Sequence, residues 1–215
     1  MKIQWLGHSC FLITTQDGTR ILTDPYDEKV GYDLPMVEAD IVTVSHAHGD
    51  HSNVGVVKGE PEVIDTADDH EVGDIYIHGH VTYHDDKRGA EKGKNIAFTI
   101  EADDLAICHL GDLGHTLNDE DVDSIGPVDI LLIPVGGFYT IDAQLATNVM
   151  EAIEPLIVVP MHVRNDKCNF TIAAVDPFVQ LNLKKTIKAH EGSTLDITAD
   201  DLPVEIEIHV LQHAL

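Results

Sequence analysis

The sequence of 215 residues is poor in positive charge, in aromatic residues and in cysteine. It has 13 Lys and Arg against 38 Asp and Glu, a net charge of −25 before histidine is counted. This balance argues against a nucleic-acid partner, because affinity for a phosphate backbone comes mainly from Lys and Arg. The cysteines Cys10, Cys108 and Cys168 form no CxxC pair, which indicates free thiols in a reducing compartment. No apolar run approaches the ~18–20 residues of a membrane span and the N-terminus has no signal-peptide pattern, so we expect a cytoplasmic protein without a membrane partner.

Short, β-branched apolar runs separated by Gly, Asp and Pro recur along the chain, and 43% of the residues are hydrophobic, which is enough for a packed core. The pattern predicts one α/β domain over residues 1–215, with two sheets faced by helices. The alternating run 204–211 predicts a strand at a sheet edge. Helices are expected at 119–125 after Asn118, at 142–153 with Asp142 as N-cap, and at 173–187. Other strands are expected at 2–7, 10–15, 20–25, 40–45, 62–65, 75–84, 95–102, 105–111, 129–135 and 156–161, the last two covered on both faces.

Histidine, by contrast, is frequent, with 14 residues, and it is a common metal ligand. The segment SHAHGDHSN at 45–53 follows a predicted strand and contains four ligand-type side chains, His46, His48, Asp50 and His51. A loop at a strand end can direct such side chains to one point, and imidazole and carboxylate suit Zn²⁺ and similar ions. The alternative, a solvated histidine-rich loop, is disfavoured by this density of ligand types.

The same pattern recurs at the ends of three other predicted strands. His84, Asp112 and His162 each stand at or just beyond the C-terminal end of an apolar run, where α/β sheets gather functional groups. Together with the residues of the 45–53 loop they make seven candidate ligands, enough for two ions if one carboxylate bridges them.

The spacing His46-x-His48-x-Asp50-His51 resembles the signature of the metallo-β-lactamase superfamily. The resemblance extends to GHSCFL (7–12), TDP (23–25), YHDD (83–86), HLGDLGH (109–115), PVGGFYT (134–140) and VPMH (159–162). Within the superfamily the chain looks like the small stand-alone hydrolases, similar to ascorbate-6-phosphate lactonase and to phosphodiesterases. The resemblance implies a four-layer αββα sandwich of the metallo-β-lactamase type. The signature is specific for this fold and far less specific for the substrate.

The resemblance also implies a ligand set. His46, His48 and His84 would bind one ion, Asp50, His51 and His162 a second, and Asp112 would lie between them. His80 remains an alternative to His84, because alternation along the strand places both on one face. His109 competes with Asp112, but the Gly-Asp pair matches the bridging position and leaves His109 as a supporting neighbour. The expected cofactors are two divalent metal ions, Zn²⁺ first, with Mn²⁺ or Fe²⁺ also suited to these ligands.

Other residues in family-like contexts are candidates for supporting or substrate-binding roles. Asp24 either supports the ligand loop or is a turn residue before Pro25. His8 could be a structural histidine, and Tyr139 could face the pocket or pack on the surface. Six of the 13 basic residues follow His84 or His162, namely Lys87, Arg88, Lys92, Lys94, Arg164 and Lys167. Of these, Arg88 and Arg164 best suit bidentate binding of an anionic substrate, although such runs are often only solvated.

Two divalent ions would generate a bridging hydroxide near neutral pH, which Asp50 could orient as the catalytic carboxylate. We therefore expect a metal-dependent hydrolase that cleaves a small anionic ester, lactone or phosphodiester. No GxSxG motif supports a serine mechanism. The alternatives are an iron-dependent oxidoreductase, which would favour an acidic residue in place of His48, and a non-catalytic metal-binding protein on the same fold.

Overall fold

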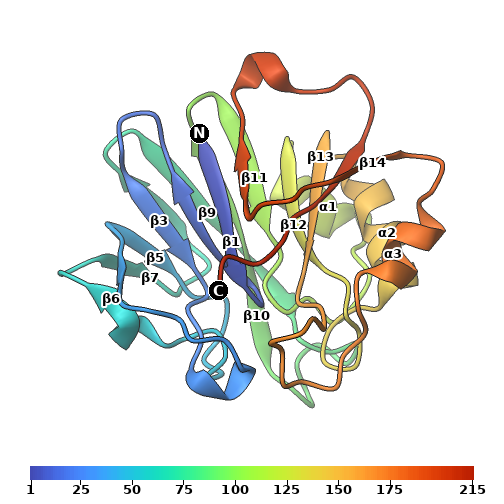
Figure 1. Cartoon of the computed structure of the whole chain (residues 1–215), viewed down its shortest axis with the longest axis horizontal. Helices are drawn as coiled ribbons and strands as arrows, with labels where there is room; N and C mark the ends of the chain where they lie inside the picture. The colour runs from blue at the N-terminus through green and yellow to red at the C-terminus, as the bar shows by residue number, and fades with distance from the viewer.

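Two β-sheets face each other in the computed structural model, which describes residues 1–215 (Figure 1). The six-stranded sheet runs in the order β15 (Thr194–Asp196), β1 (Lys2–Gly7), β2 (Cys10–Thr14), β3 (Arg20–Thr23), β5 (Ile41–Thr43) and β7 (Glu62–Ile64). The eight-stranded sheet runs in the order β14 (Thr186–Ala189), β16 (Glu207–Val210), β13 (Ile157–Met161), β12 (Ile130–Pro134), β11 (Leu105–His109), β10 (Lys94–Ala102), β9 (Ile75–Tyr83) and β8 (Asp69–Val72).

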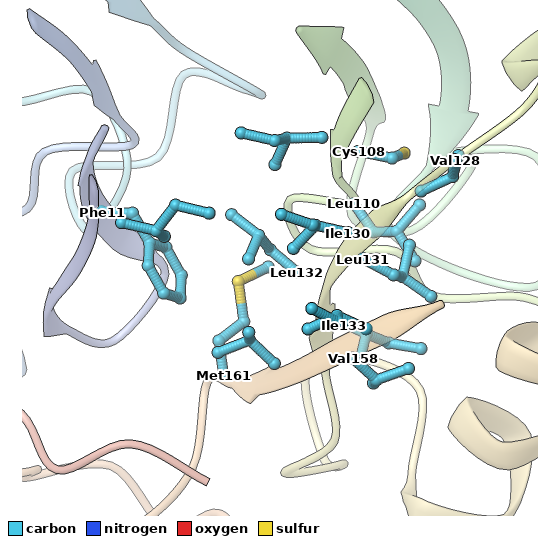
Figure 2. Close-up of a cluster of buried hydrophobic side chains, with 14 of the residues drawn as sticks. Phe11, Cys108, Leu110, Val128, Ile130, Leu131, Leu132, Ile133, Val158 and Met161 are labelled. Atoms are coloured by element: carbon cyan, nitrogen blue, oxygen red, sulfur yellow. The ribbon is translucent and has the colours of Figure 1, made fainter. Parts of the chain in front are cut away.

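The main hydrophobic core comprises 42 buried residues and includes the layer between the two sheets. Figure 2 shows Phe11 from β2 on one side of this core and Leu132 and Met161 from β12 and β13 on the other. Every residue of β12 and β13 is buried, as the sequence predicted for strands covered on both faces. The three α-helices, α1 (Asp119–Ile125), α2 (Ala143–Ile153) and α3 (Asp176–Leu181), lie on the side of the eight-stranded sheet that faces away from the six-stranded sheet (Figure 1).

The outer face of the six-stranded sheet has a different cover. It consists of the 3₁₀ helices η1 (Glu28–Val30) and η2 (Val54–Val56) and a small sheet of β4 (Val37–Glu38) and β6 (Val57–Lys58). These segments enclose a second hydrophobic core of 11 buried residues that includes Tyr26 and Tyr32. The predicted layered α/β arrangement is therefore confirmed, with 3₁₀ helices and a strand pair rather than α-helices in this outer layer.

The helix predicted over 173–187 is wrong in extent. Only Asp176–Leu181 is helical, and Thr186–Ala189 forms β14 instead. The Asn182 side-chain amide donates to the Phe178 carbonyl at 2.9 Å and so competes for the last turn of the helix. Thr186 and Ile187 beyond it are β-branched and favour a strand.

The predicted edge strand over 204–211 is present as β16, but it does not lie at an edge. β16 pairs in parallel with β13 on one side and with β14 on the other. The edge of the sheet is instead formed by β14, whose first residues were predicted to be helical. Within β16, Ile208 and His209 are both buried. The alternation of polar and apolar residues in this strand therefore does not correspond to one exposed face and one buried face.

The capping predictions for the first two helices are confirmed. Asn118 accepts the backbone N–H of Asp121, and Asp142 accepts those of Gln144 and Leu145. None of the α-helices has the length and apolar character that a membrane crossing requires.

Candidate metal centre

Histidine and aspartate side chains gather where strands of both sheets end. β3 and β5 are parallel, and so are β11, β12 and β13. β9 runs in the same direction as β11, since both are antiparallel to β10. The carboxyl ends of these strands therefore place the candidate ligands at one edge of each sheet. The two edges are joined by a hydrogen bond of 3.1 Å from the His162 N–H to the His8 carbonyl.

The first group consists of His46, His48 and His84. One ring nitrogen of each lies within 4.8 Å of the others. The ring centroids are 4.6 Å apart for His46 and His48 and 4.9 Å apart for His46 and His84. His84 is buried whereas His48 is exposed, so this group opens to solvent on the His48 side. These are the three residues that the resemblance assigned to one ion.

The second group consists of His8, Asp50, His51 and His162, whose ligand atoms also lie within 4.8 Å of one another. The three histidines are fully buried and Asp50 is half-buried. His8 Nε2 lies 3.4 Å from Asp50 Oδ2, and its ring centroid is 4.2 Å from that of His162. The sequence predicts a supporting or structural role for His8, whereas the structure places it inside the group.

Asp112 lies between the two groups and is buried. Its Oδ2 is 3.2 Å from His84 Nε2, on the side of the first group. Its Oδ1 is 3.2 Å from His51 Nε2 and 3.5 Å from His162 Nε2, on the side of the second. One carboxylate therefore faces both groups, the position that a bridging ligand requires.

Asp24 is buried behind the 45–53 loop and holds it by three hydrogen bonds. Its carboxylate accepts the Ser45 N–H at 2.7 Å, the Ser45 hydroxyl at 2.6 Å and the His51 Nδ1–H at 2.8 Å. Because the Ser45 hydroxyl donates to Asp24, its oxygen accepts the His46 Nδ1–H at 2.9 Å. This network directs Nε2 of His46 and of His51 at the centre, the usual task of carboxylates behind metal-binding histidines.

His80 does not join either group. Its ring nitrogens are 3.2 Å from the hydroxyl oxygens of Thr99 and Ser124, the latter on α1. Alternation along the strand places His80 and His84 on the same face and does not distinguish them as ligands. In the structure β9 ends at Tyr83, so His84 lies just beyond the strand. The structure therefore places His84, and not His80, among the candidate ligands.

His109 is also used elsewhere. Its Nε2–H donates to the Ser9 carbonyl at 2.8 Å, and its Nδ1 accepts the Gly111 N–H at 3.2 Å. Both ring nitrogens are engaged, so His109 lies behind the ligands and connects β11 to the turn after β1.

Arg88 and Arg164 have no hydrogen bond or ion pair with either group. Arg88 is exposed and lines a hollow that also contains Glu120 and Asp121. Arg164 is exposed and lines a different hollow, beside Trp5. Neither arginine contacts a candidate ligand, and their role in binding an anionic substrate stays a prediction.

Tyr139 lies on the loop after β12 and is linked to the centre through Phe170. The ring centroids of Tyr139 and Phe170 are 5.7 Å apart, and those of Phe170 and His8 are 5.5 Å apart. Lys92 Nζ donates to the Tyr139 carbonyl at 2.7 Å. Phe170 lies in an irregular segment, and no sequence motif predicts its place beside the centre.

Several buried atoms of the centre have no hydrogen-bond partner. They include Nε2 of His46 and both ring nitrogens of His162. A buried polar atom left unpaired costs about 1–3 kcal/mol, and a cation placed among these atoms would satisfy them together. The residues present therefore fit divalent metal ions.

The protonation states agree with this fit. Burial lowers the pKa of His46 and of His162 to about 3, so both rings are neutral with a free lone pair. Burial opposes ionisation of Asp112, but His162 and His51 outweigh it and hold the pKa of this carboxyl well below its usual value. Burial also opposes protonation of His51, but Asp112 and Asp24 outweigh it and raise the pKa of His51 well above its usual value. In the metal-free protein a proton on His51 therefore balances two carboxylates, a role that a bound cation would take over.

Comparisons with known proteins agree with this geometry. The profile of the beta-lactamase superfamily domain matches residues 2–162. A UPF0173 protein of Pyrococcus furiosus is 30% identical over 189 aligned positions, which cover 75% of this chain and 83% of that protein. A UPF0173 metal-dependent hydrolase of Thermoplasma acidophilum is 28% identical over 232 positions, covering 96% and 99% of the two chains. A Thermotoga maritima structure, described as a candidate Zn-dependent hydrolase of the metallo-beta-lactamase superfamily, superposes with a TM-score of 0.78 at 35% identity and covers 98% of each chain.

Proposed function

Since the chain belongs to the beta-lactamase superfamily, we propose that it is a metal-dependent hydrolase with two divalent cations at the centre described above. Relatives that align over almost the whole chain carry that description, which supports a hydrolase. The observation that carries the two-cation form is the position of Asp112, whose carboxylate oxygens face one histidine group each.

In this proposal His46, His48 and His84 hold one cation, and Asp50, His51 and His162 hold the other, with Asp112 shared. Zn²⁺ suits a histidine-rich set best, and Mn²⁺ or Fe²⁺ would accept the same ligands. When bound, two such ions supply a water whose pKa is brought near 7 and Lewis acidity toward a carbonyl or phosphoryl oxygen.

The residues around the centre have distinct tasks. Asp50 is half-buried, and hydrogen bonding by His8 together with the nearby His51 holds its pKa below the ordinary value in spite of burial, so it is ionised at neutral pH. Its carboxylate can therefore accept a hydrogen of the attacking water and orient it. The fully buried rings of His8, His51 and His162 exclude solvent from behind the centre. Access is left on the side of exposed His48.

We further propose that the substrate is a small anionic ester, lactone or phosphodiester rather than a nucleic acid. A net charge of −25 repels a polymeric phosphate backbone. A single positively charged side chain beside the centre could still attract a small anion. We assign this role to Lys92 rather than to Arg88 or Arg164, because Lys92 is attached to the loop of Tyr139 beside the centre.

Metal analysis and a substrate panel test the proposal. Protein purified without chelator and then supplied with Zn²⁺ or Mn²⁺ should contain close to two ions per chain by elemental analysis, since seven ligands exceed what one tetrahedral ion takes. It should hydrolyse anionic p-nitrophenyl phosphodiesters or acidic lactones, lose this activity on chelation, and regain it when the metal is restored. A reproducible ratio of one ion per chain under metal-replete conditions would refute the two-cation form. Faster turnover of neutral esters would refute the anionic substrate.

A further inference from the structure

Aromatic side chains are scarce in this chain and are mostly buried. Trp, Tyr and Phe make up 5% of the residues. Phe138 and Tyr139 are exceptions, because 73% and 37% of their surfaces are exposed. Together with half-buried Phe170 they form a contiguous group, which we call the aromatic wall. Adjacent exposed aromatic residues are unusual in a chain that buries most of its aromatic side chains, and such clusters are typical of binding surfaces.

The aromatic wall borders the metal centre. The Phe138 and Tyr139 ring centroids are 4.7 Å apart, and Tyr139 leads to Phe170 at 5.7 Å. Phe170 in turn meets the ring of His8 edge-on at 5.5 Å. His8 belongs to the second ligand group. A molecule whose scissile bond lies at the centre can therefore extend along the wall.

The wall is held in place although it is exposed. Lys92 Nζ donates to the carbonyls of Phe138 at 3.3 Å and Tyr139 at 2.7 Å. The loop that carries Lys92 is itself fixed by Asp85, whose carboxylate accepts four backbone N–H groups, including that of Lys92 at 2.7 Å. Phe138 has a φ of 65°, a left-handed conformation that a bulky residue adopts only when the surroundings impose it. Such strain is concentrated at ligand-binding sites.

We propose that the aromatic wall binds a flat aromatic or conjugated ring of the substrate, attached to the ester or phosphodiester that is hydrolysed at the centre. Ring faces and edges at these separations offer a third ring the stacked or edge-to-face contacts that aromatic groups prefer. Lys92 lies beside the wall, with its Nζ 5.9 Å from the centroid of the Tyr139 ring, and adds attraction for an anionic group on the same molecule. This inference rests on the proposed hydrolase function and narrows its substrate class.

Binding of two phosphonates to the metal-loaded protein tests the inference without turnover. Phenylphosphonate and methylphosphonate share an anionic head that metal ions bind, and neither has an ester bond to hydrolyse. Calorimetric titration should show phenylphosphonate binding about tenfold more tightly, the size of one good aromatic contact. Tyr139→Leu and Phe170→Leu keep an apolar side chain but remove the ring, and each should reduce this preference to about threefold or less.

Two further variants complete the test, and Tyr76→Leu is the matched control. Tyr76→Leu removes an exposed aromatic residue of β9 outside the wall and should leave the tenfold preference intact. Lys92→Gln should weaken binding of both phosphonates and also lower the preference for phenylphosphonate, because Lys92 attracts their common head and also holds the Phe138 and Tyr139 carbonyls. Metal content is measured on every sample. Where Phe170→Leu changes it, Tyr139→Leu decides the test, since Tyr139 has no ring contact with a candidate ligand.

The outcomes separate the two proposals. Equal affinity for both phosphonates, or a preference that survives Tyr139→Leu, overturns the aromatic-ring inference. The hydrolase proposal stands in that case if the metal-loaded protein still cleaves esters. If neither phosphonate binds and no ester is cleaved, the proposed function fails and this inference fails with it.

Discussion

Replacing Asp112 by asparagine tests the centre most directly. The substitution keeps the shape of the side chain but removes its charge and converts one oxygen into an amide nitrogen, which cannot ligate a cation. Because Oδ2 faces His84 at 3.2 Å and Oδ1 faces His51 at 3.2 Å, either orientation of the amide deprives one group of its shared ligand. Asp112→Asn should therefore lower the bound metal from two ions per chain to one or fewer.

The expected magnitude follows from comparison with residues that only support ligands. Loss of a supporting partner typically weakens metal binding by ~10–100-fold. A ligand shared by both ions should exceed that range, so Asp112→Asn should cost at least about 100-fold, or about 2.8 kcal/mol, in the affinity of the second ion.

His109→Ala is the matched control, since His109 is equally buried and lies three positions away at the end of the same strand. It removes the partner of the Ser9 carbonyl, which costs about 1–3 kcal/mol of folding free energy and should lower the melting temperature by about 2–12 °C. Metal affinity should change less than tenfold in this variant, because neither ring nitrogen is free to bind a cation.

Both variants are assayed by competition with a chromogenic chelator and by elemental analysis, and the melting temperature is measured after metal removal. The expected pattern is a metal defect in Asp112→Asn and a stability defect in His109→Ala. If His109→Ala strips the metal while Asp112→Asn retains two ions, our assignment of this strand end is wrong.

Three other predictions concern the surroundings of the centre. Asp24→Asn should weaken metal binding by ~10–100-fold, because it replaces the carboxylate that orients the ligand loop with a neutral amide. Gly114→Ala should lower both metal content and melting temperature, since a Cβ at this position would lie 2.3 Å from the carbonyl carbon and oxygen of His84. The metal-free protein should lose stability as the pH falls from 6.5 toward 4. The unfolded chain takes up protons at His46 and His162 there, whereas the folded chain, with pKa values of about 3, does not. Each of these histidines should contribute up to about 1.4 kcal/mol per pH unit to the loss, measured by urea unfolding.

Each of these predictions has its own contradicting result. Unchanged metal affinity in Asp24→Asn would refute the prediction that this carboxylate orients the ligand histidines. Gly192→Ala introduces a Cβ with no atom within 4 Å and should have little effect, so an equal loss in both glycine variants would deny a specific clash at position 114. Flat stability between pH 6.5 and 4 would contradict the neutral buried rings. His51 adds an opposing slope only near pH 6.5, where its unfolded form is half protonated; below about pH 5.5 it is protonated in both states and adds almost none.

The sequence predicts most of the candidate ligands because their signal is local. His46 to His51 lie within one loop, and Asp112 follows a strand that is readily recognised from its apolar residues. The choice between His84 and His80 could not be made in the same way, since positions four apart on a strand share a face. It depends on where β9 ends and on the close approach of Gly114 to the His84 backbone, and both are set by distant residues.

The place of His8 and Phe170 beside the centre could not be predicted for a related reason. His8 comes next to His162 only because the turn after β1 meets the end of β13 in the other sheet, 154 positions along the chain. Phe170 belongs to an irregular segment, and no periodicity in the sequence predicts its contact with His8. The helix expected over 173–187 failed similarly, because its C-terminal part pairs with β16, which comes later in the chain.

These long-range contacts place the centre at the seam between the two sheets. The first sheet supplies His8 and the 45–53 loop, and the second supplies His84, Asp112 and His162. No sheet contains a complete ligand group by itself: the first group needs His84 from the second sheet, and the second group needs His162. The edges are also tied by direct bonds, from the His162 N–H to the His8 carbonyl and from His109 to the Ser9 carbonyl. Cations bound here would therefore hold the sheets together as well as act on substrate, because ligands that bind only the folded chain stabilise it by mass action. The fold needs both sheets for its core, and the proposed chemistry needs the same pairing for its ligands.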